Sequence, residues 1–240
     1  MLHTNTYYYY YFFFSLISFS IAELIAQRCR AQNKRCLALG GAKNHLIVAQ
    51  DRHLDMASSD IVASFTGCTG QRCMAASVLV TLGHQQDLID EVVRKASLLQ
   101  PGQEPGQIGP VIDQASLDKI LYYIDESEKN GAKILLDGRK WVASRNPEVS
   151  DKLKKGWWIG PTVILHTNRN DAALHEEIFG PVISIVEATS REDALAIQSA
   201  SQYGNAGSYH RSIVVYKHTI IYKFPQHQST LQAVPSQNGS

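Results

Sequence analysis

Short apolar segments alternate with amphipathic ones from about Lys34 onward, and this alternation limits the fold more than any other feature of the chain. Strands are predicted at residues 45–50, 76–82, 133–136, 162–166 and 182–187, and helices at 55–65 and 87–99, around 117–124 and after residue 190. Strands separated by helices favour the α/β class, in which a mostly parallel sheet is covered by helices.

Local signals mark the helices and their ends. One helix face is indicated by apolar residues at i, i+3, i+4 and i+7, namely Leu117, Ile120, Leu121 and Ile124. Asn130-Gly131 is a typical helix end, and the run from Ser190 to Asp193 resembles a capping box that opens the last helix.

Composition limits the classes of partner. A chain of 240 residues with 44% hydrophobic residues can build one ordinary core. The net charge is +1 with no basic stripe, so no nucleic-acid partner is expected. The four cysteines lack zinc-site spacing, so no metal is predicted, and their scarcity favours a reducing compartment such as the cytoplasm or the mitochondrial matrix.

The two ends of the chain differ in texture from the middle. Residues 1–33 carry five consecutive tyrosines, three phenylalanines and an apolar run at 7–25 that is long enough to suggest a membrane anchor. No Lys or Arg precedes this run, so a membrane role is not expected, and 1–33 is predicted to be an atypical leader outside the fold. Residues 34–209 form the predicted domain, and 210–240 a loose tail.

The sharpest local feature is GCTGQRCMAAS at 67–77, a glycine-bracketed loop that presents Cys73 just before a predicted strand. A cysteine taken alone is usually an inert buried thiol, and Cys68, five residues earlier, keeps that interpretation. The neighbouring motifs change the interpretation of Cys73.

Five motifs occur in one order: LALGGAKNHLIV, GQRCM, IGPVI, GPTVI and EEIFGPVISI. Together they resemble the aldehyde dehydrogenase superfamily over about residues 34–209. The resemblance implies that the fold is the catalytic domain of that family and that Cys73 is its nucleophile. A thiolate adds to an aldehyde carbon and, after hydride transfer to a nicotinamide, carries a thioester that is still activated.

The resemblance also assigns the cofactor residues. Glu177 and Phe179 match family positions that bind the nicotinamide ribose of NAD and flank its ring; without the motif they would be a surface acid and a core aromatic. The backbone N–H of Cys73 would donate to the oxyanion, with a second donor from a cofactor-binding half that has no match upstream of Lys34. Lys43 and Asn44 could be structural or could approach the active site, and the sequence leaves both open.

One departure indicates the acyl acceptor. Hydrolytic members carry a glutamate two residues before Gly-Gly as the base for water, and this chain has Ala38 there. With AKNH and RCM, this resembles the acylating methylmalonate-semialdehyde and malonate-semialdehyde branch, which implies oxidation of the semialdehyde to acyl-CoA with NAD and coenzyme A, in valine or thymine breakdown.

The predicted catalytic domain is incomplete. No cofactor-binding glycine fingerprint is recognised, and the portion that completes the sheet and supports homo-oligomers in full-length relatives is not matched. The alternative is therefore a catalytically inactive fragment or truncated gene model, and a membrane-anchored form is a third option. Substrate preference, NAD against NADP and the acyl acceptor stay open.

Overall fold

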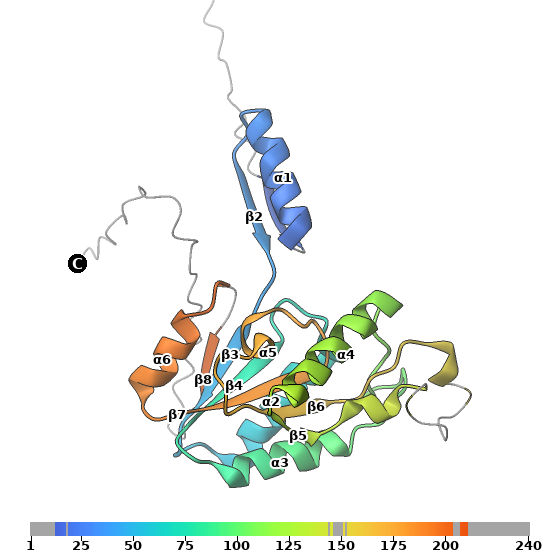
Figure 1. Ribbon diagram of the computed structural model, residues 1–240, viewed down its shortest axis with the longest axis vertical. Helices are drawn as coiled ribbons and strands as arrows, with labels where there is room; N and C mark the ends of the chain where they lie inside the picture. Colours follow the sequence, from blue (N-terminus) through green and yellow to red (C-terminus); the bar gives the residue numbers. More distant parts are fainter. Residues whose placement is uncertain are drawn as a thin grey trace, which may run out of the picture.

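A computed structural model describes residues 13–17, 19–143, 145, 151, 153–203 and 207–210. These residues form a six-stranded sheet in the order β5-β6-β7-β4-β3-β8 and a separate two-stranded sheet of β1 and β2 (Figure 1). The strands of the large sheet are β3 (Asn44–Val48), β4 (Ala76–Leu82), β5 (Lys133–Leu136), β6 (Thr162–Leu165), β7 (Val182–Ala188) and β8 (Gly207–His210).

The large sheet is parallel except at one edge. β3, β4, β6, β7 and β8 run in the same direction, and only β5 pairs antiparallel, with β6. Parallel neighbours need a crossover connection, and the helices between these strands supply it. The predicted α/β class with a mostly parallel, helix-covered sheet is confirmed.

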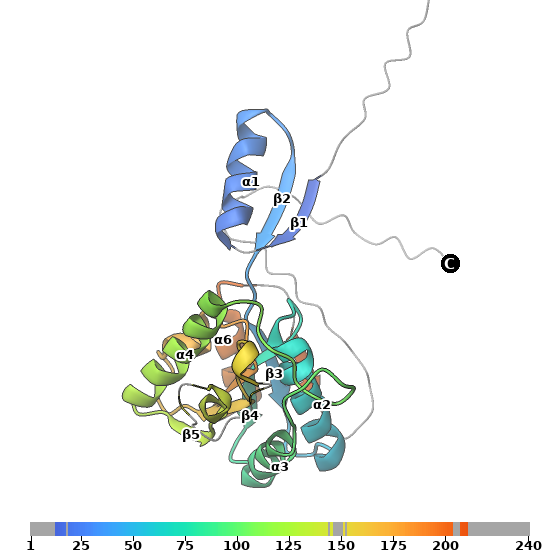
Figure 2. The same ribbon diagram turned by 90° about the vertical axis from the view of Figure 1, so that its right-hand side faces the viewer.

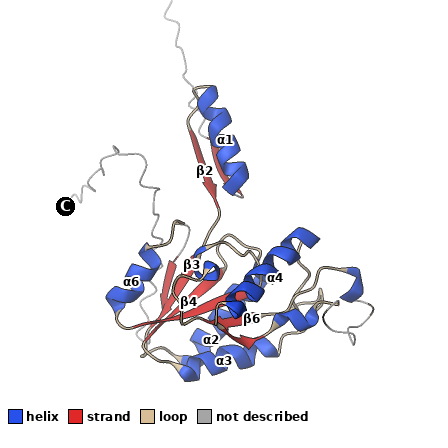
Figure 3. Ribbon diagram, viewed as in Figure 1, coloured by secondary structure: helices blue, strands red, loops and turns tan. Residues whose placement is uncertain are grey.

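Helices cover both faces of this sheet (Figures 1 and 3). α2 (Leu54–Thr66) and α3 (Gln86–Ser97) pack on one face, where Phe65, Leu79 and Ile183 share a fully buried core. α4 (Gln114–Lys129) and α5 (Ala172–His175) cover part of the other face, beside α6 (Arg191–Ser199). Alternate residues of each strand therefore enter different cores, as the two-residue period of a strand requires.

The helix ends follow the predicted signals. Asp113 Oδ1 accepts a hydrogen bond of 2.7 Å from the backbone N–H of Ser116 at the start of α4. Asn130 caps its end, and Gly131 follows with φ +88°. Ser190 Oγ accepts from the N–H of Asp193, so the predicted start of α6 is confirmed. Three short 3-10 helices complete the described elements: η1 (Gly67–Gly70), η2 (Gly138–Trp141) and η3 (Leu153–Lys155).

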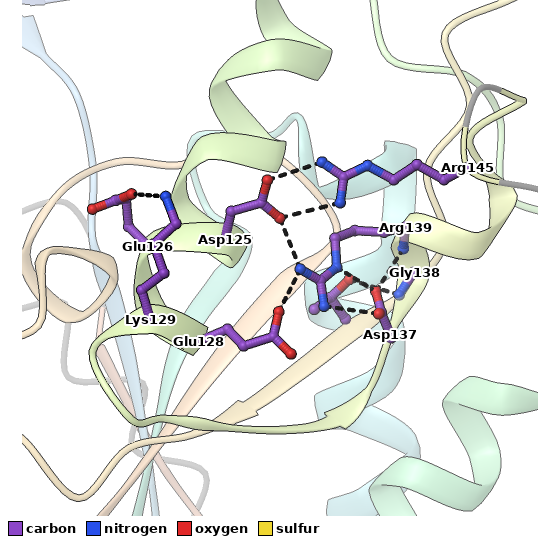
Figure 4. Close-up of polar contacts among 9 residues, drawn as sticks. Asp125, Glu126, Glu128, Lys129, Asp137, Gly138, Arg139 and Arg145 are labelled. Carbon is purple, nitrogen blue, oxygen red and sulfur yellow. Dashed lines mark hydrogen bonds and ion pairs between the residues drawn. The ribbon is translucent and has the colours of Figure 1, made fainter.

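An ion-pair network fixes the edge of the sheet beside β5 (Figure 4). Arg139 of η2 bonds to Asp137 and reaches Asp125 and Glu128 of α4, each at 2.7–2.9 Å. Gly138 leaves no room for a side chain, because a Cβ there would lie 1.9 Å from the carbonyl oxygen of Gly160. The network therefore ties η2 to α4 across the end of β5.

A separate unit precedes the large sheet. β1 (Phe13–Ile17) and β2 (Cys36–Gly40) pair in parallel, and α1 (Phe19–Ala31) connects them and packs on β2. Figure 2 shows this unit projecting away from the six-stranded sheet, with β2 leading into β3. Neither β1 nor α1 was predicted, because the aromatic run hides any regular periodicity.

The predicted boundaries at residues 34 and 209 stay predictions. Residues 1–12 and 211–240 lie outside the described residues, and so does most of the predicted tail. Among the described helices, none is both long enough and apolar enough to cross a membrane.

Candidate active site

The predicted site residues gather at one edge of the large sheet. Cys73 precedes β4, Lys43 precedes β3, and Phe179 precedes β7. The strands β3, β4 and β7 are adjacent and parallel, so their amino-terminal ends lie together. The fold thus brings three distant segments of the chain to the amino-terminal edge of the sheet.

Cys73 lies on an unusual loop. The side chain of Cys73 is exposed, and so is that of Cys68, so the expectation of a buried thiol is wrong for Cys68. Cys68, Thr69 and Gly70 have φ values of 52°, 57° and 68°. The left-handed region costs each non-glycine residue roughly 1–2 kcal/mol, so the loop must be held by its surroundings.

Hydrogen bonds to two neighbouring segments, the end of α2 and residues 109–112, hold the loop. Arg72 Nη2 donates to the carbonyl oxygens of Ala63 and Ser64 at 3.2 and 2.8 Å. These carbonyls belong to the last turn of α2, where the helix dipole stabilises a cation. Thr69 Oγ1 donates to the carbonyl of Gly109 at 2.9 Å. Gln71 Oε1 accepts from the N–H of Ile112 at 3.0 Å.

Asn44 bonds directly to the cysteine loop. Its side chain is buried, and its Nδ2 donates to the carbonyl oxygens of Cys73 and Ala75, each at 2.8 Å. Of the two possibilities that the sequence left open for Asn44, the structure thus places it against the candidate nucleophile. No local pattern indicated this contact, because 29 residues separate the two partners.

Glu177 and Phe179 lie on the segment that faces the cysteine loop. Glu177 Oε1 accepts a hydrogen bond of 2.9 Å from the N–H of Ala42. Phe179 has φ 60° and 42% of its surface exposed, so it is not a core aromatic. A half-buried carboxylate beside an exposed aromatic ring fits the ribose and the ring of a nicotinamide nucleotide.

The absence of a side chain on Gly70 lets these segments touch. A Cβ on Gly70 would lie 2.0 Å from the carbonyl oxygen of Gly180, so only glycine at residue 70 allows this contact. Gly70 is three residues before Cys73, and Gly180 directly follows Phe179. The backbone contact therefore brings the cysteine loop against the segment that carries Glu177 and Phe179.

Buried cationic and imidazole groups lie behind this edge. Burial lowers the pKa of Lys43 to about 7, although the attraction of Glu177 opposes the shift. Among the described residues, Lys43 Nζ has no hydrogen-bond partner. Burial lowers the pKa of His45 to about 4, and it also lowers the pKa of His166. Lys43 and Glu177 thus interact electrostatically, without a hydrogen bond from Nζ.

The remaining acids have structural partners. Glu176 accepts a hydrogen bond from Tyr123, and Asp171 accepts one from Ser127. His175 is exposed. In the described part of the chain, no group of three or more His, Cys, Asp or Glu residues could hold a metal ion.

A pocket of about 780 Å³ lies between α2, η1 and the segment at residues 106–110. Cys68 and Thr69 line it together with Lys95 and Leu99, and Cys73 does not. Ala38, where hydrolytic relatives were expected to carry a base, lies on β2 opposite Ser15 of β1.

Comparisons with known proteins identify the family of the chain. The aldehyde dehydrogenase family model matches residues 17–213, and thus begins within the predicted leader. Malonate-semialdehyde dehydrogenase 2 of Geobacillus thermodenitrificans is 35% identical over 189 residues, which are 77% of this chain and 38% of that protein. The mitochondrial, acylating methylmalonate-semialdehyde dehydrogenase of Arabidopsis thaliana is 35% identical over 187 residues, covering 77% of this chain and 30% of that protein.

A solved structure gives the same result. A Sinorhizobium meliloti protein, assigned as a methylmalonate-semialdehyde dehydrogenase and solved with NAD, superposes with a TM-score of 0.77 at 30% identity. The match covers 83% of this chain and 40% of that one. The chain thus spans well under half the length of the relatives it matches. The family match and the fold show that this chain belongs to the aldehyde dehydrogenase family.

Proposed function

We propose that this chain carries the nucleophile of an NAD-dependent, CoA-acylating oxidation of malonate semialdehyde or methylmalonate semialdehyde. The observation that supports this most is the contact between Gly70 and Gly180, which sets the exposed Cys73 loop beside Glu177 and Phe179. A nucleophile and a cofactor site must be neighbours for a hydride to pass between them.

Cys73 carries the acyl group in this proposal. Its thiolate attacks the aldehyde carbon to give a thiohemiacetal alkoxide, and the backbone N–H of Cys73 donates to that oxyanion. Loss of hydride from the same carbon leaves a thioester on the sulfur. The thiolate of coenzyme A then attacks the thioester carbonyl, and the Cys73 thiolate departs with the bonding electrons.

NAD, when bound, supplies the acceptor for the hydride. Glu177 would bind the nicotinamide ribose through its carboxylate, and the exposed ring of Phe179 would flank the nicotinamide end. Support for NAD comes from the Sinorhizobium meliloti relative, whose structure holds this cofactor. Support for the substrate class comes from the names of the Geobacillus and Arabidopsis relatives.

Coenzyme A is the proposed acyl acceptor because Ala38 offers no base at the position from which hydrolytic members activate water. A thiol ionises more readily than water and needs less help to attack a thioester. The Arabidopsis relative is named as acylating, which supports the same acceptor. The mitochondrial matrix and the cytoplasm stay the expected compartments, since one of these relatives is mitochondrial and another bacterial.

The test is turnover of malonate semialdehyde by the purified chain with NAD and coenzyme A, followed by absorbance of the reduced nicotinamide. Intact-mass spectrometry without coenzyme A should find a single acyl group on Cys73. Cys73→Ser should abolish both signals, whereas Cys68→Ser, its exposed neighbour, should retain them.

Two results would contradict the proposal. A folded chain that forms neither the reduced nicotinamide nor the acyl adduct would not carry this activity. Turnover that survives in Cys73→Ser would assign the nucleophile elsewhere.

A further inference from the structure

We infer that Asn44 is a positioning residue that fixes the candidate nucleophile loop through its backbone carbonyls. The inference concerns the site proposed above and rests on that function for its kinetic consequences. Its structural part depends only on the contacts of Asn44 with residues 73–77.

The side-chain amide of Asn44 donates hydrogen bonds to the two backbone carbonyls on either side of Met74. An asparagine amide has two N–H donors, and Nδ2 makes one hydrogen bond of 2.8 Å to Cys73 and another to Ala75. Asn44 is 5% exposed, and its bond to Ala75 is buried, whereas its bond to the exposed Cys73 is partly buried. A single buried side chain thereby fixes both peptide carbonyls that surround the residue after the nucleophile.

The main chain of Asn44 adds a third point of attachment. Its N–H donates to Ser77 Oγ at 3.0 Å, and the same hydroxyl donates back to the carbonyl of Asn44 at 3.3 Å. The β3–β4 register shifts at this point, because Asn44 pairs with Ala76 whereas His45 pairs with Val78. The regular hydrogen-bond ladder between β3 and β4 is thus interrupted beside Cys73. The side-chain amide of Asn44 makes hydrogen bonds to the β4 side at this point instead.

The same short segment also holds the cofactor side of the site. The N–H of Ala42 donates to Glu177 Oε1 at 2.9 Å, and the buried ammonium of Lys43 attracts the same carboxylate. Three consecutive residues therefore contact the nucleophile loop at one end and the candidate ribose-binding acid at the other. We infer that residues 42–44 set the separation of the two groups, with Asn44 responsible for the side of Cys73.

The loop needs such an attachment because its conformation is not self-supporting. Cys68 and Thr69 adopt left-handed backbone conformations that neither residue favours. Without the two amide bonds, the carbonyls of Cys73 and Ala75 would lose their buried donor, and Cys73 would sample other orientations. A misplacement of about 1 Å is enough to slow a positioned reaction by about 100-fold.

The test compares Asn44→Ala with Asn168→Ala, a surface asparagine whose side chain accepts a hydrogen bond from the N–H of Asn170 within its own turn. Hydrogen–deuterium exchange of the native chain should rise at Ala75 and Ala76, whose N–H groups bond to Arg72 and Ser64, and should stay unchanged in α4. Asn168→Ala should leave both regions as in the wild type. This measurement does not require turnover, so it remains informative if the proposed function fails.

Kinetics provide the second measurement. In Asn44→Ala the rate of acyl transfer to Cys73 should fall by about 100-fold, with the KM for NAD within about twofold of wild type. Asn44→Asp keeps the shape but turns an acceptor toward two carbonyls, so it should be at least as slow as the alanine variant. Unchanged exchange at Ala75 and Ala76, or a loss confined to the KM for NAD, would overturn the inference.

Discussion

At the scale of single residues, the contact between Gly70 and Gly180 brings the two segments of the proposed site together. Gly70 meets two separate demands, a φ of 68° and a neighbouring carbonyl oxygen that excludes a Cβ. Gly106 has a similar φ of 84° but no atom within 4 Å of the position of a Cβ. A comparison of substitutions at Gly70 and Gly106 therefore separates the cost of backbone strain from the cost of the close approach.

Gly106→Ala should lower the free energy of unfolding by about 1 kcal/mol, because it introduces only left-handed strain. Gly70→Ala should lower it by a further roughly 1–3 kcal/mol, because a methyl group must push the segment of Gly180 away. Urea unfolding of both variants measures the difference. Equal losses would mean that the loop of Cys73 relaxes without separating from Phe179.

The sequence predicted which residues form the candidate site but not all of the contacts between them. Cys73, Glu177 and Phe179 were selected through motifs, and the structure brings their segments together. The contact of Asn44 with Cys73 could not be predicted, because the hydrogen bonds of Asn44 depend on the register shift between β3 and β4. Register is a property of two strands, whereas a sequence pattern reports on each strand by itself.

At the scale of elements, the network at Arg139 shows how a short 3-10 helix is kept in place. The Arg139 side chain is 11% exposed and contacts Asp125, Glu128 and Asp137 (Figure 4). These carboxylates raise the pKa of Arg139 further above its usual range. Arg145 shares Asp125 but is 39% exposed, which makes it a natural comparison.

Arg139→Met should lower the free energy of unfolding by about 2–3 kcal/mol, since three carboxylates lose their common cation. The loss should stay below that of a fully buried pair because the carboxylates are partly exposed to water. Arg145→Met should cost no more than about 1 kcal/mol. Thermal unfolding in low and high salt measures both, and equal effects would refute a special role for Arg139.

Element prediction succeeded where periodicity was strong and failed where pairing alone defines a strand. α3 and α4 have clear apolar faces, and both lie where they were predicted. β8 was not predicted, since its four residues gain strand structure by pairing with β3 at the sheet edge. β1 and α1 were missed because the aromatic and apolar residues there show no clean period.

At the scale of the whole molecule, the location of the site departs from a common rule. Open α/β sheets usually bind ligands beyond the carboxyl ends of their strands. Here Cys73, Phe179 and Asn44 all lie at the amino-terminal ends of β4, β7 and β3. The strand pattern alone would therefore have placed the site at the opposite ends of the strands, and only the motifs indicate the location that we propose.

The buried bases behind this edge also determine how the fold responds to acid. His45 is 5% exposed, and burial lowers its pKa to about 4 from an ordinary value of 6.5. Between these two pH values the unfolded chain binds the proton and the folded chain does not. Stability from His45 is thus fully present above about pH 6.5 and is lost as the pH falls toward 4.

This linkage predicts a loss of roughly 3 kcal/mol from His45 between pH 6.5 and 4, with His166 acting in the same direction. The free energy of unfolding of His45→Gln should fall less steeply over that range than that of wild type. His84→Gln, whose side chain is 71% exposed in the native chain, should retain the full slope. Denaturant unfolding at several pH values measures the slopes, and a parallel wild-type and His45→Gln profile would show that His45 titrates alike in both states.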